Sequence, residues 1–174
     1  MNKELDKKII KILEETISKE HIKILEQLRE PRYDEDIAEE LNEKAVTIRK
    51  LLNELHDKEL VQYVRTKNPK TGWYTYVWDR RNDKILEYVK NQINDKISGI
   101  DEKLDYEKNS LMFACPCSEE YVQMTRAMEI NFLCQKCDGN LIEFDNSDIV
   151  RDFETDKSEL ETELGKINKI KIEG

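Results

Sequence analysis

The sequence predicts a mainly helical protein with one β-hairpin and a small, cysteine-rich β segment, and three observations support this fold class. First, apolar residues recur at helical spacing through most of the chain. Second, residues 60–78 break this pattern with two runs of β-forming residues around a turn that contains proline and glycine. Third, all four cysteines lie within residues 115–137. We therefore expect four parts, at residues 1–80, 81–110, 111–146 and 147–174.

Composition and charge limit the functions that this chain can have. The 174 residues are 38% hydrophobic and 39% charged, which favours several small cores over one large core. No run approaches the roughly 20 apolar residues that cross a bilayer, and the N-terminus carries no apolar leader. We therefore expect a soluble, cytoplasmic protein with no membrane partner. A net charge of -9 opposes binding of nucleic acid over the whole surface, so any such contact should be local.

Apolar periodicity predicts a bundle of short helices in the first part. The predicted helices cover residues 5–17, 21–29, 34–41 and 44–58. Pro31 ends the second, because proline cannot continue a helix. Asp34 is available to cap the third, whose acidic residues gather at its positive N-terminal end. The last two helices form a helix-turn-helix arrangement.

Two predicted strands follow the helices, at residues 60–66 and 73–78, with a turn at 68–72. Alternation divides the second strand into two faces, one with Tyr74, Tyr76 and Trp78 and the other with Trp73, Thr75 and Val77. A helical bundle followed by such a hairpin makes a winged helix. A small bundle cannot cover both faces, so one aromatic row is a candidate for contact with a partner protein or an unpaired base.

Charge is unevenly distributed over this part. Residues 64–81 hold five basic side chains against one acidic one, whereas residues 34–43 hold six acids and no base. Acids there oppose docking on DNA, because the first helix of a helix-turn-helix crosses the phosphate backbone. We therefore expect duplex DNA to be bound weakly and without sequence preference. The candidate contact residues on the wing are Arg65, Lys67, Lys70, Trp73, Tyr74, Tyr76, Arg80 and Arg81.

The part at 81–110 is predicted to be a connecting helix. Its apolar residues form a narrow line, which suits a coiled-coil pairing better than a further core: Ile85, Val89, Ile93, Ile97, Ile100 and Leu104. Gly99 is the position at which one unbroken helix is least favoured. The last part, 147–174, reads as a charged, amphipathic helix or tail.

The four cysteines form two close pairs, Cys115 with Cys117 and Cys134 with Cys137. Four thiolates in this arrangement can close a tetrahedral zinc site, which a segment with almost no core needs in order to fold. We expect the site to be structural, because four protein ligands leave no open position. Gly139 is expected to supply the positive φ of the second turn.

Two alternatives to a zinc site remain open. Cys134 and Cys137 could form a redox dithiol, or the segment could be a ribbon that has lost its metal. A redox motif would be expected within a β-α-β unit, which this sequence does not predict. Without a metal, the segment would need to replace several kcal/mol of folding free energy from very few apolar residues.

These motifs together resemble a known family, archaeal transcription factor E, which is homologous to the alpha subunit of the eukaryotic general transcription factor IIE. Its zinc ribbon is matched by residues 113–117, 127–134 and 137–141, and its winged helix by residues 35–41, 47–52 and 70–78. The resemblance runs over nearly the whole chain in the same order. The first cysteine pair departs from the family pattern, because it is one residue shorter.

The resemblance implies an accessory initiation factor without catalytic residues, which binds RNA polymerase at its clamp and stalk and assists promoter opening. It also implies contact with promoter DNA near the melted region and the TATA-binding protein as a partner within the initiation complex. The zinc ligands would be Cys115, Cys117, Cys134 and Cys137.

Two other functions remain as hypotheses. A sequence-specific winged-helix regulator with metal- or redox-sensing cysteines would need a basic recognition helix and usually a symmetric dimer. A zinc or thiol enzyme would need an open metal position or a reactive thiol.

Overall fold

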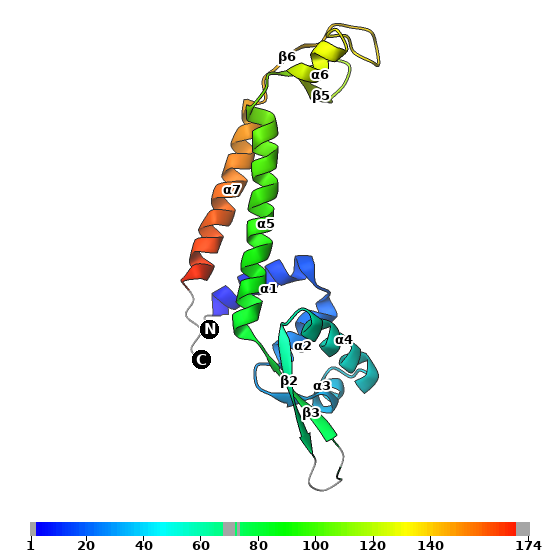
Figure 1. The fold of residues 1–174 in the computed structure, drawn as a ribbon, viewed down its shortest axis with the longest axis vertical. Helices are drawn as coiled ribbons and strands as arrows, with labels where there is room; N and C mark the ends of the chain where they lie inside the picture. The colour runs from blue at the N-terminus through cyan, green and yellow to red at the C-terminus, as the bar shows by residue number, and fades with distance from the viewer. Residues whose placement is uncertain (1–2, 68–71, 73, 170–174) are drawn as a thin grey trace. The chain divides into compact units, whose positions relative to one another are not determined.

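The computed structural model describes the chain except for residues 1–2, 68–71, 73 and 170–174 (Figure 1). Contacts divide the chain into two compact units, one made mainly of the residues up to Gln92 and the other of Ile93–Asn168. The structure is mainly helical with two small antiparallel sheets, as predicted. Within the described residues, no helix is both long enough and apolar enough to cross a membrane.

The first unit begins with the predicted helical bundle. Its helices are α1 (Lys3–Thr16), α2 (Lys19–Gln27), α3 (Asp34–Glu40) and α4 (Ala45–Asp57). Their inward residues are the ones that periodicity selects, and Leu28, Ile37 and Leu52 are fully buried. Burial of such side chains stabilises the folded state by about 1.5–3 kcal/mol each. The bundle therefore has an apolar core of its own.

Three strands accompany these helices: β1 (Arg32–Tyr33), β2 (Val61–Lys67) and β3 (Tyr74–Arg80). The sheet order is β1-β3-β2, and the β2–β3 register runs from Val61 opposite Arg80 to Lys67 opposite Tyr74. The hairpin and the bundle confirm the winged helix. The sequence did not predict β1, because two residues are too few to show a strand period.

The role expected of Asp34 as a helix cap is wrong. The residue before α3 is Tyr33, which makes no side-chain capping bond, and Asp34 lies within the first turn. Its carboxylate is buried, with 5% of the residue exposed, and forms an ion pair with Arg49 of α4. A buried carboxylate needs a charged partner. Asp34 therefore joins α3 to α4.

Helix α5 (Asn82–Lys108) corresponds to the predicted connecting helix and continues without a break through Gly99. Helix α7 (Ser147–Asn168) runs beside its second half (Figure 1). Lys157 Nζ lies 2.6 Å from the carboxylate of Asp101, and the Lys103 ammonium lies 5.5 Å from the centre of the Phe153 ring. The second half of α5 therefore has a partner within the same chain, held by an ion pair and a cation–π contact from a helix distant in sequence.

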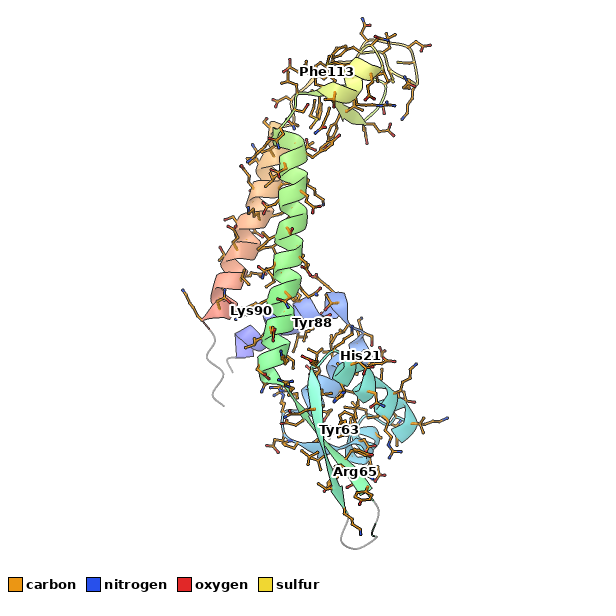
Figure 2. The ribbon with its side chains drawn as sticks, viewed as in Figure 1. His21, Tyr63, Arg65, Tyr88, Lys90 and Phe113 are labelled. Atoms are coloured by element: carbon orange, nitrogen blue, oxygen red, sulfur yellow. The ribbon has the colours of Figure 1, made fainter. Side chains whose placement is uncertain are left out.

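The cysteine segment between these helices is a small ribbon. It contains β4 (Met112–Ala114), β5 (Tyr121–Gln123), α6 (Met124–Glu129) and β6 (Ile142–Phe144), with the sheet order β5-β4-β6. Phe113, labelled in Figure 2, meets Phe132 edge-to-face with ring centroids 5.0 Å apart. Both rings are only partly buried, and the buried apolar side chains of the ribbon are few: Met112, Cys115, Ala127 and Cys134. The ribbon therefore has little core.

A buried carboxylate fixes the ribbon to the end of α5. Glu107, 5% exposed, accepts hydrogen bonds from the hydroxyl of Tyr121 at 2.7 Å and from the side-chain amide of Asn146 at 2.7 Å. The same amide also donates to the Glu107 carbonyl oxygen at 2.9 Å. The bond to Glu107, with partial burial, raises the pKa of Tyr121 to about 12. This network connects β5, the last turn of α5 and the residue before α7.

Candidate metal centre and aromatic wing

The ribbon brings the four cysteine sulfurs to one point. All four Sγ atoms lie within 4.8 Å of one another. Two sulfur–sulfur contacts of 3.5 Å join Cys115 to Cys137 and Cys117 to Cys134, and both cross between the two pairs. Cys115 and Cys134 are buried, whereas Cys117 and Cys137 are exposed.

The second pair forms a tight turn around Cys134. Its backbone N–H donates to the Gly139 carbonyl at 2.8 Å, and the N–H of Lys136 points at Cys134 Sγ at 3.4 Å. The reason expected for Gly139 is wrong, because the positive φ of 56° belongs to Asp138. A Cβ on Gly139 would instead lie 3.3 Å from Cys137 Sγ. Glycine therefore leaves room for the sulfur.

The pKa values of Cys134 and Cys117 are shifted in opposite directions. The N–H groups of Lys136 and Cys137 favour the thiolate and lower the pKa of Cys134 to about 7. The adjacent sulfurs, that of Cys115 first, raise the pKa of Cys117. A bound cation would hold the sulfurs as thiolates.

The donor set and its spacing fit zinc. In a tetrahedral site, Zn–S bonds of about 2.3 Å give sulfur–sulfur edges of about 3.8 Å. The 3.5 Å contacts are close to that edge, and the other separations stay below 4.8 Å. The four-cysteine cluster could therefore hold a metal ion.

The hairpin places four of the predicted contact residues near its tip. Arg65 and Lys67 on β2 lie opposite Tyr76 and Tyr74 on β3. The Arg65 guanidinium carbon lies 3.7 Å from the centre of the Tyr74 ring, a cation–π contact (Arg65 is labelled in Figure 2). Lys70 and Trp73 lie outside the described residues.

Arg80 and Arg81 do not join this group. They lie where β3 ends, six residues along the strand from Tyr74, or about 20 Å. Arg80 is half-buried, and Arg81 donates to the Asp83 carboxylate at 3.0 Å. The basic run read from the sequence is therefore divided between the tip and the base of the hairpin.

Sequence reasoning missed two tyrosines of this surface. Tyr63 on β2 is 44% exposed, and its ring lies 5.3 Å from that of Tyr76 and 5.0 Å from that of Trp78 (Figure 2). The pairing of the two predicted strands could have revealed Tyr63, because it lies opposite Trp78 and therefore on the same face of the hairpin. Tyr33 on β1 borders the same surface. A groove of about 500 Å³ is lined by Tyr33, Asp34, Glu35, Arg49, Asn53, Tyr63, Tyr74, Thr75, Tyr76 and Trp78.

The helix that would read DNA bases has little free positive charge. Arg49 pairs with Asp34 and also lies 3.3 Å from Glu35. Lys50 lies 3.8 Å from Glu54 on the same helix. Lys44, directly before α4, is exposed, but Glu39 on α3 and Glu43 on the turn are exposed as well and oppose it. This surface is therefore a poor match for a phosphate backbone.

Comparison with known proteins places the chain in a family. The model for the TFIIE alpha subunit matches residues 4–109, which cover the winged helix and α5. Transcription factor E of Methanocaldococcus jannaschii is 40% identical over 131 residues, 75% of this chain and 76% of that protein. The Thermococcus kodakarensis protein of the same name is 30% identical over 95% of this chain and 91% of its own length.

A solved structure, a possible transcriptional regulator from Methanosarcina mazei Go1, aligns with a TM-score of 0.48 at 16% identity, over 59% of this chain and 88% of that one. The family assignment rests on the sequence matches instead. The chain belongs to the family of transcription factor E and the TFIIE alpha subunit, a family of basal transcription initiation factors rather than of enzymes.

Proposed function

We propose that this protein binds RNA polymerase at its clamp and stalk and assists the opening of promoter DNA. Family membership supports a role in initiation. The observation that carries the finer proposal is the exposed surface of the hairpin, where Tyr63, Tyr74 and Tyr76 surround Arg65. Such a surface suits a partner protein and unpaired bases better than duplex DNA.

The alternative of a sequence-specific regulator is less well supported. It needs a basic recognition helix, and Arg49 on α4 is already paired with acids of α3. We therefore propose that promoter DNA is contacted near the melted region, weakly and without sequence preference. A salt titration of duplex binding should give a shallow slope, because few phosphates are neutralised. Tight binding to a short palindrome would instead support the regulator.

Assistance to promoter opening has a simple physical basis. Stacking of an unpaired base on an aromatic side chain contributes about 1–3 kcal/mol. Tyr74 and Arg65 at the hairpin could supply such contacts, and preferential binding to one clamp position would add to them. Either effect lowers the free energy of the open complex relative to the closed one.

The ribbon has a structural part in this proposal. Cys115, Cys117, Cys134 and Cys137 would hold Zn²⁺, and the metal would keep the ribbon folded as a second docking surface. The TATA-binding protein is a further partner that we propose within the initiation complex. If the ribbon lost its metal and unfolded, its docking surface would be lost as well.

A reconstituted archaeal transcription assay tests the proposal. The protein should stimulate transcription from a weak promoter on linear DNA, and less from the same promoter with a pre-melted bubble. Arg65→Ala should reduce the stimulation, while Arg151→Ala, an equal loss of charge on exposed α7, should not. Equal stimulation of both templates would show that melting is not the assisted step.

A further inference from the structure

The two turns that carry the cysteines differ in the backbone N–H groups that face their sulfurs. At the second turn, the Lys136 N–H points at Cys134 Sγ at 3.4 Å. The Gly139 N–H forms a backbone hydrogen bond to the Cys137 sulfur. Such bonds hold the electron pair of a thiolate and lower its nucleophilicity. Both sulfurs of the second turn are therefore made less reactive toward electrophiles.

The first turn uses its backbone N–H groups differently. Pro116 has none. The Ser118 N–H donates to the Cys115 carbonyl oxygen at 3.0 Å, and the Glu120 N–H donates to the Ser118 hydroxyl at 3.2 Å. Within the described part of the chain, no N–H is recorded as a donor to the sulfur of Cys117, which is exposed. Cys117 is therefore the exposed cysteine whose electron pair is least stabilised.

A second sulfur lies within reach of Cys117. Its Sγ atom is 3.5 Å from Sγ of Cys134, so an approach of about 1.5 Å gives the S–S bond length of about 2.05 Å. Lys136 places a cation beside this pair, because its Nζ lies 3.2 Å from the hydroxyl of Ser118, the residue after Cys117. The Glu120 carboxylate, 3.0 Å from Nζ, holds the ammonium there. An ammonium in this position stabilises a hydroxide that leaves the sulfur.

We infer that Cys117 is an oxidation site for hydroperoxides, which join it to Cys134 in a disulfide and so open the metal centre. The Cys117 thiolate attacks one oxygen of hydrogen peroxide, the O–O bond breaks and hydroxide leaves, which gives a sulfenic acid. The Cys134 thiolate then attacks the Cys117 sulfur, the S–O bond breaks and a second hydroxide leaves. Two thiolates lose two electrons, and the peroxide with two protons becomes two waters.

This reaction differs from the redox dithiol of Cys134 and Cys137, because it crosses between the two turns. The disulfide removes two of the four ligands, so the ribbon loses the metal that is proposed to close it. The inference therefore rests on the proposed zinc closure. It gives the ribbon a sensitivity to peroxide that the winged helix lacks, since all four cysteines lie within residues 115–137.

The test uses the full chain, whose zinc content is measured first. Limiting iodoacetamide should alkylate Cys117 about fivefold faster than Cys137, the other exposed cysteine, a factor that corresponds to one hydrogen bond. Hydrogen peroxide should then release one zinc for each disulfide formed, as read with a coloured chelator. A full zinc content with equal labelling of both cysteines would overturn this inference alone. A zinc content near zero would contradict the zinc closure as well.

Mass spectrometry of tryptic peptides identifies the disulfide. Cleavage after Arg126 and Lys136 separates Cys134 from both exposed cysteines. The first linked peptides should join the segment that holds Cys117 to the segment that ends at Lys136. A first link from Cys134 to Cys137 would instead support the redox dithiol and overturn the inference.

Two variants at the buried cysteines separate the two steps. Cys134→Ser removes the second thiolate, so peroxide should leave Cys117 as a sulfenic acid, which dimedone traps. Cys115→Ser, which removes the other buried cysteine, is the control and should still form the disulfide between Cys117 and Cys134, with little dimedone adduct. Each variant lacks one ligand, so a difference in product does not come from metal loss. Equal dimedone labelling of the two variants, or an adduct on Cys137 in place of Cys117, would contradict the inference.

Discussion

The two three-stranded sheets of this protein are stabilised in different ways. The hairpin sheet packs on helices, with Val61 and Trp78 almost fully buried against a core of leucine and isoleucine. The ribbon sheet has strands of three residues each, and two of its few buried side chains, Cys115 and Cys134, are cysteines. Hydrophobic burial can hold the first sheet. The ribbon sheet instead depends on a link between the sulfurs of the four cysteines.

Among the predicted changes, metal removal should alter the stability of the two sheets most unequally. We expect about one zinc per chain, and its removal by a chelator under reducing conditions should cost the ribbon several kcal/mol. Hydrogen exchange should then become fast at 112–144 while the winged helix stays protected, which makes the winged helix an internal control. A zinc content near zero with a protected ribbon would contradict the account.

Two variants at the cysteine site should lower its metal affinity to different extents. Cys134→Ser removes a ligand and should behave like the chelated protein. Gly139→Ala places a Cβ 3.3 Å from Cys137 Sγ, so metal should still bind but more weakly. Competition with a coloured chelator measures both affinities. The prediction fails if Gly139→Ala loses as much metal affinity as Cys134→Ser.

A core substitution should give the opposite pattern. Leu52 of α4 is fully buried, and Leu52→Ala should lower the free energy of unfolding of the winged helix by about 2–5 kcal/mol. Trp78 is buried on β3, and the other tryptophan of the sequence, Trp73, precedes it by five residues, so tryptophan fluorescence in denaturant follows this unit. Metal content should not change. Loss of zinc in Leu52→Ala would show that the two sheets do not fold independently.

The bond between Tyr121 and Glu107 should have a smaller effect. Tyr121→Phe removes one hydrogen bond to a buried carboxylate and should destabilise the ribbon by about 1–3 kcal/mol. The pKa of Tyr121 is raised from the ordinary tyrosine value of about 10 to about 12 by its hydrogen bond to Glu107. Its contribution is therefore complete below pH 10.0 and is lost as the pH rises toward about 12.

Absorbance of tyrosinate tests this pH dependence. One tyrosine should ionise at higher pH than the others, and Tyr121→Phe should remove that step. Tyr106→Phe, a loss of a hydroxyl from an exposed neighbour on α5, provides the control and should leave the step in place. Persistence of the late step in Tyr121→Phe would assign it to another residue.

The sequence predicted those elements whose pattern is local. Helices α1 to α5 and α7 follow from apolar spacing, and the hairpin follows from two runs of β-formers. Strand β1 could not be predicted, since it is defined by pairing with β3 and not by its own two residues. The partner of α5 was missed for the same reason, because α7 is distant in sequence.

The candidate sites show the same limit. Cysteine spacing predicted a cluster, and the structure brings the four sulfurs together, while their role as zinc ligands stays a prediction. The basic run at 64–81 was read as one patch, but Arg65 lies opposite Tyr76, four residues or about 13 Å along β3 from Arg80, so the basic side chains fall at two places on the hairpin. The four-part domain division also stays a prediction, because the contacts divide the chain within α5.

Polymerase binding tests the central claim most directly. The full chain should form a stable complex with an archaeal RNA polymerase in native electrophoresis or analytical ultracentrifugation. Tyr74→Ala at the hairpin should weaken this complex by about tenfold or more, as loss of an aromatic contact does at a protein interface. Tyr88→Ala on α5 is the control for loss of a tyrosine away from the hairpin. This variant should bind the polymerase as tightly as the unchanged chain does. If the intact, zinc-loaded protein forms no complex with the polymerase, the proposed function is contradicted.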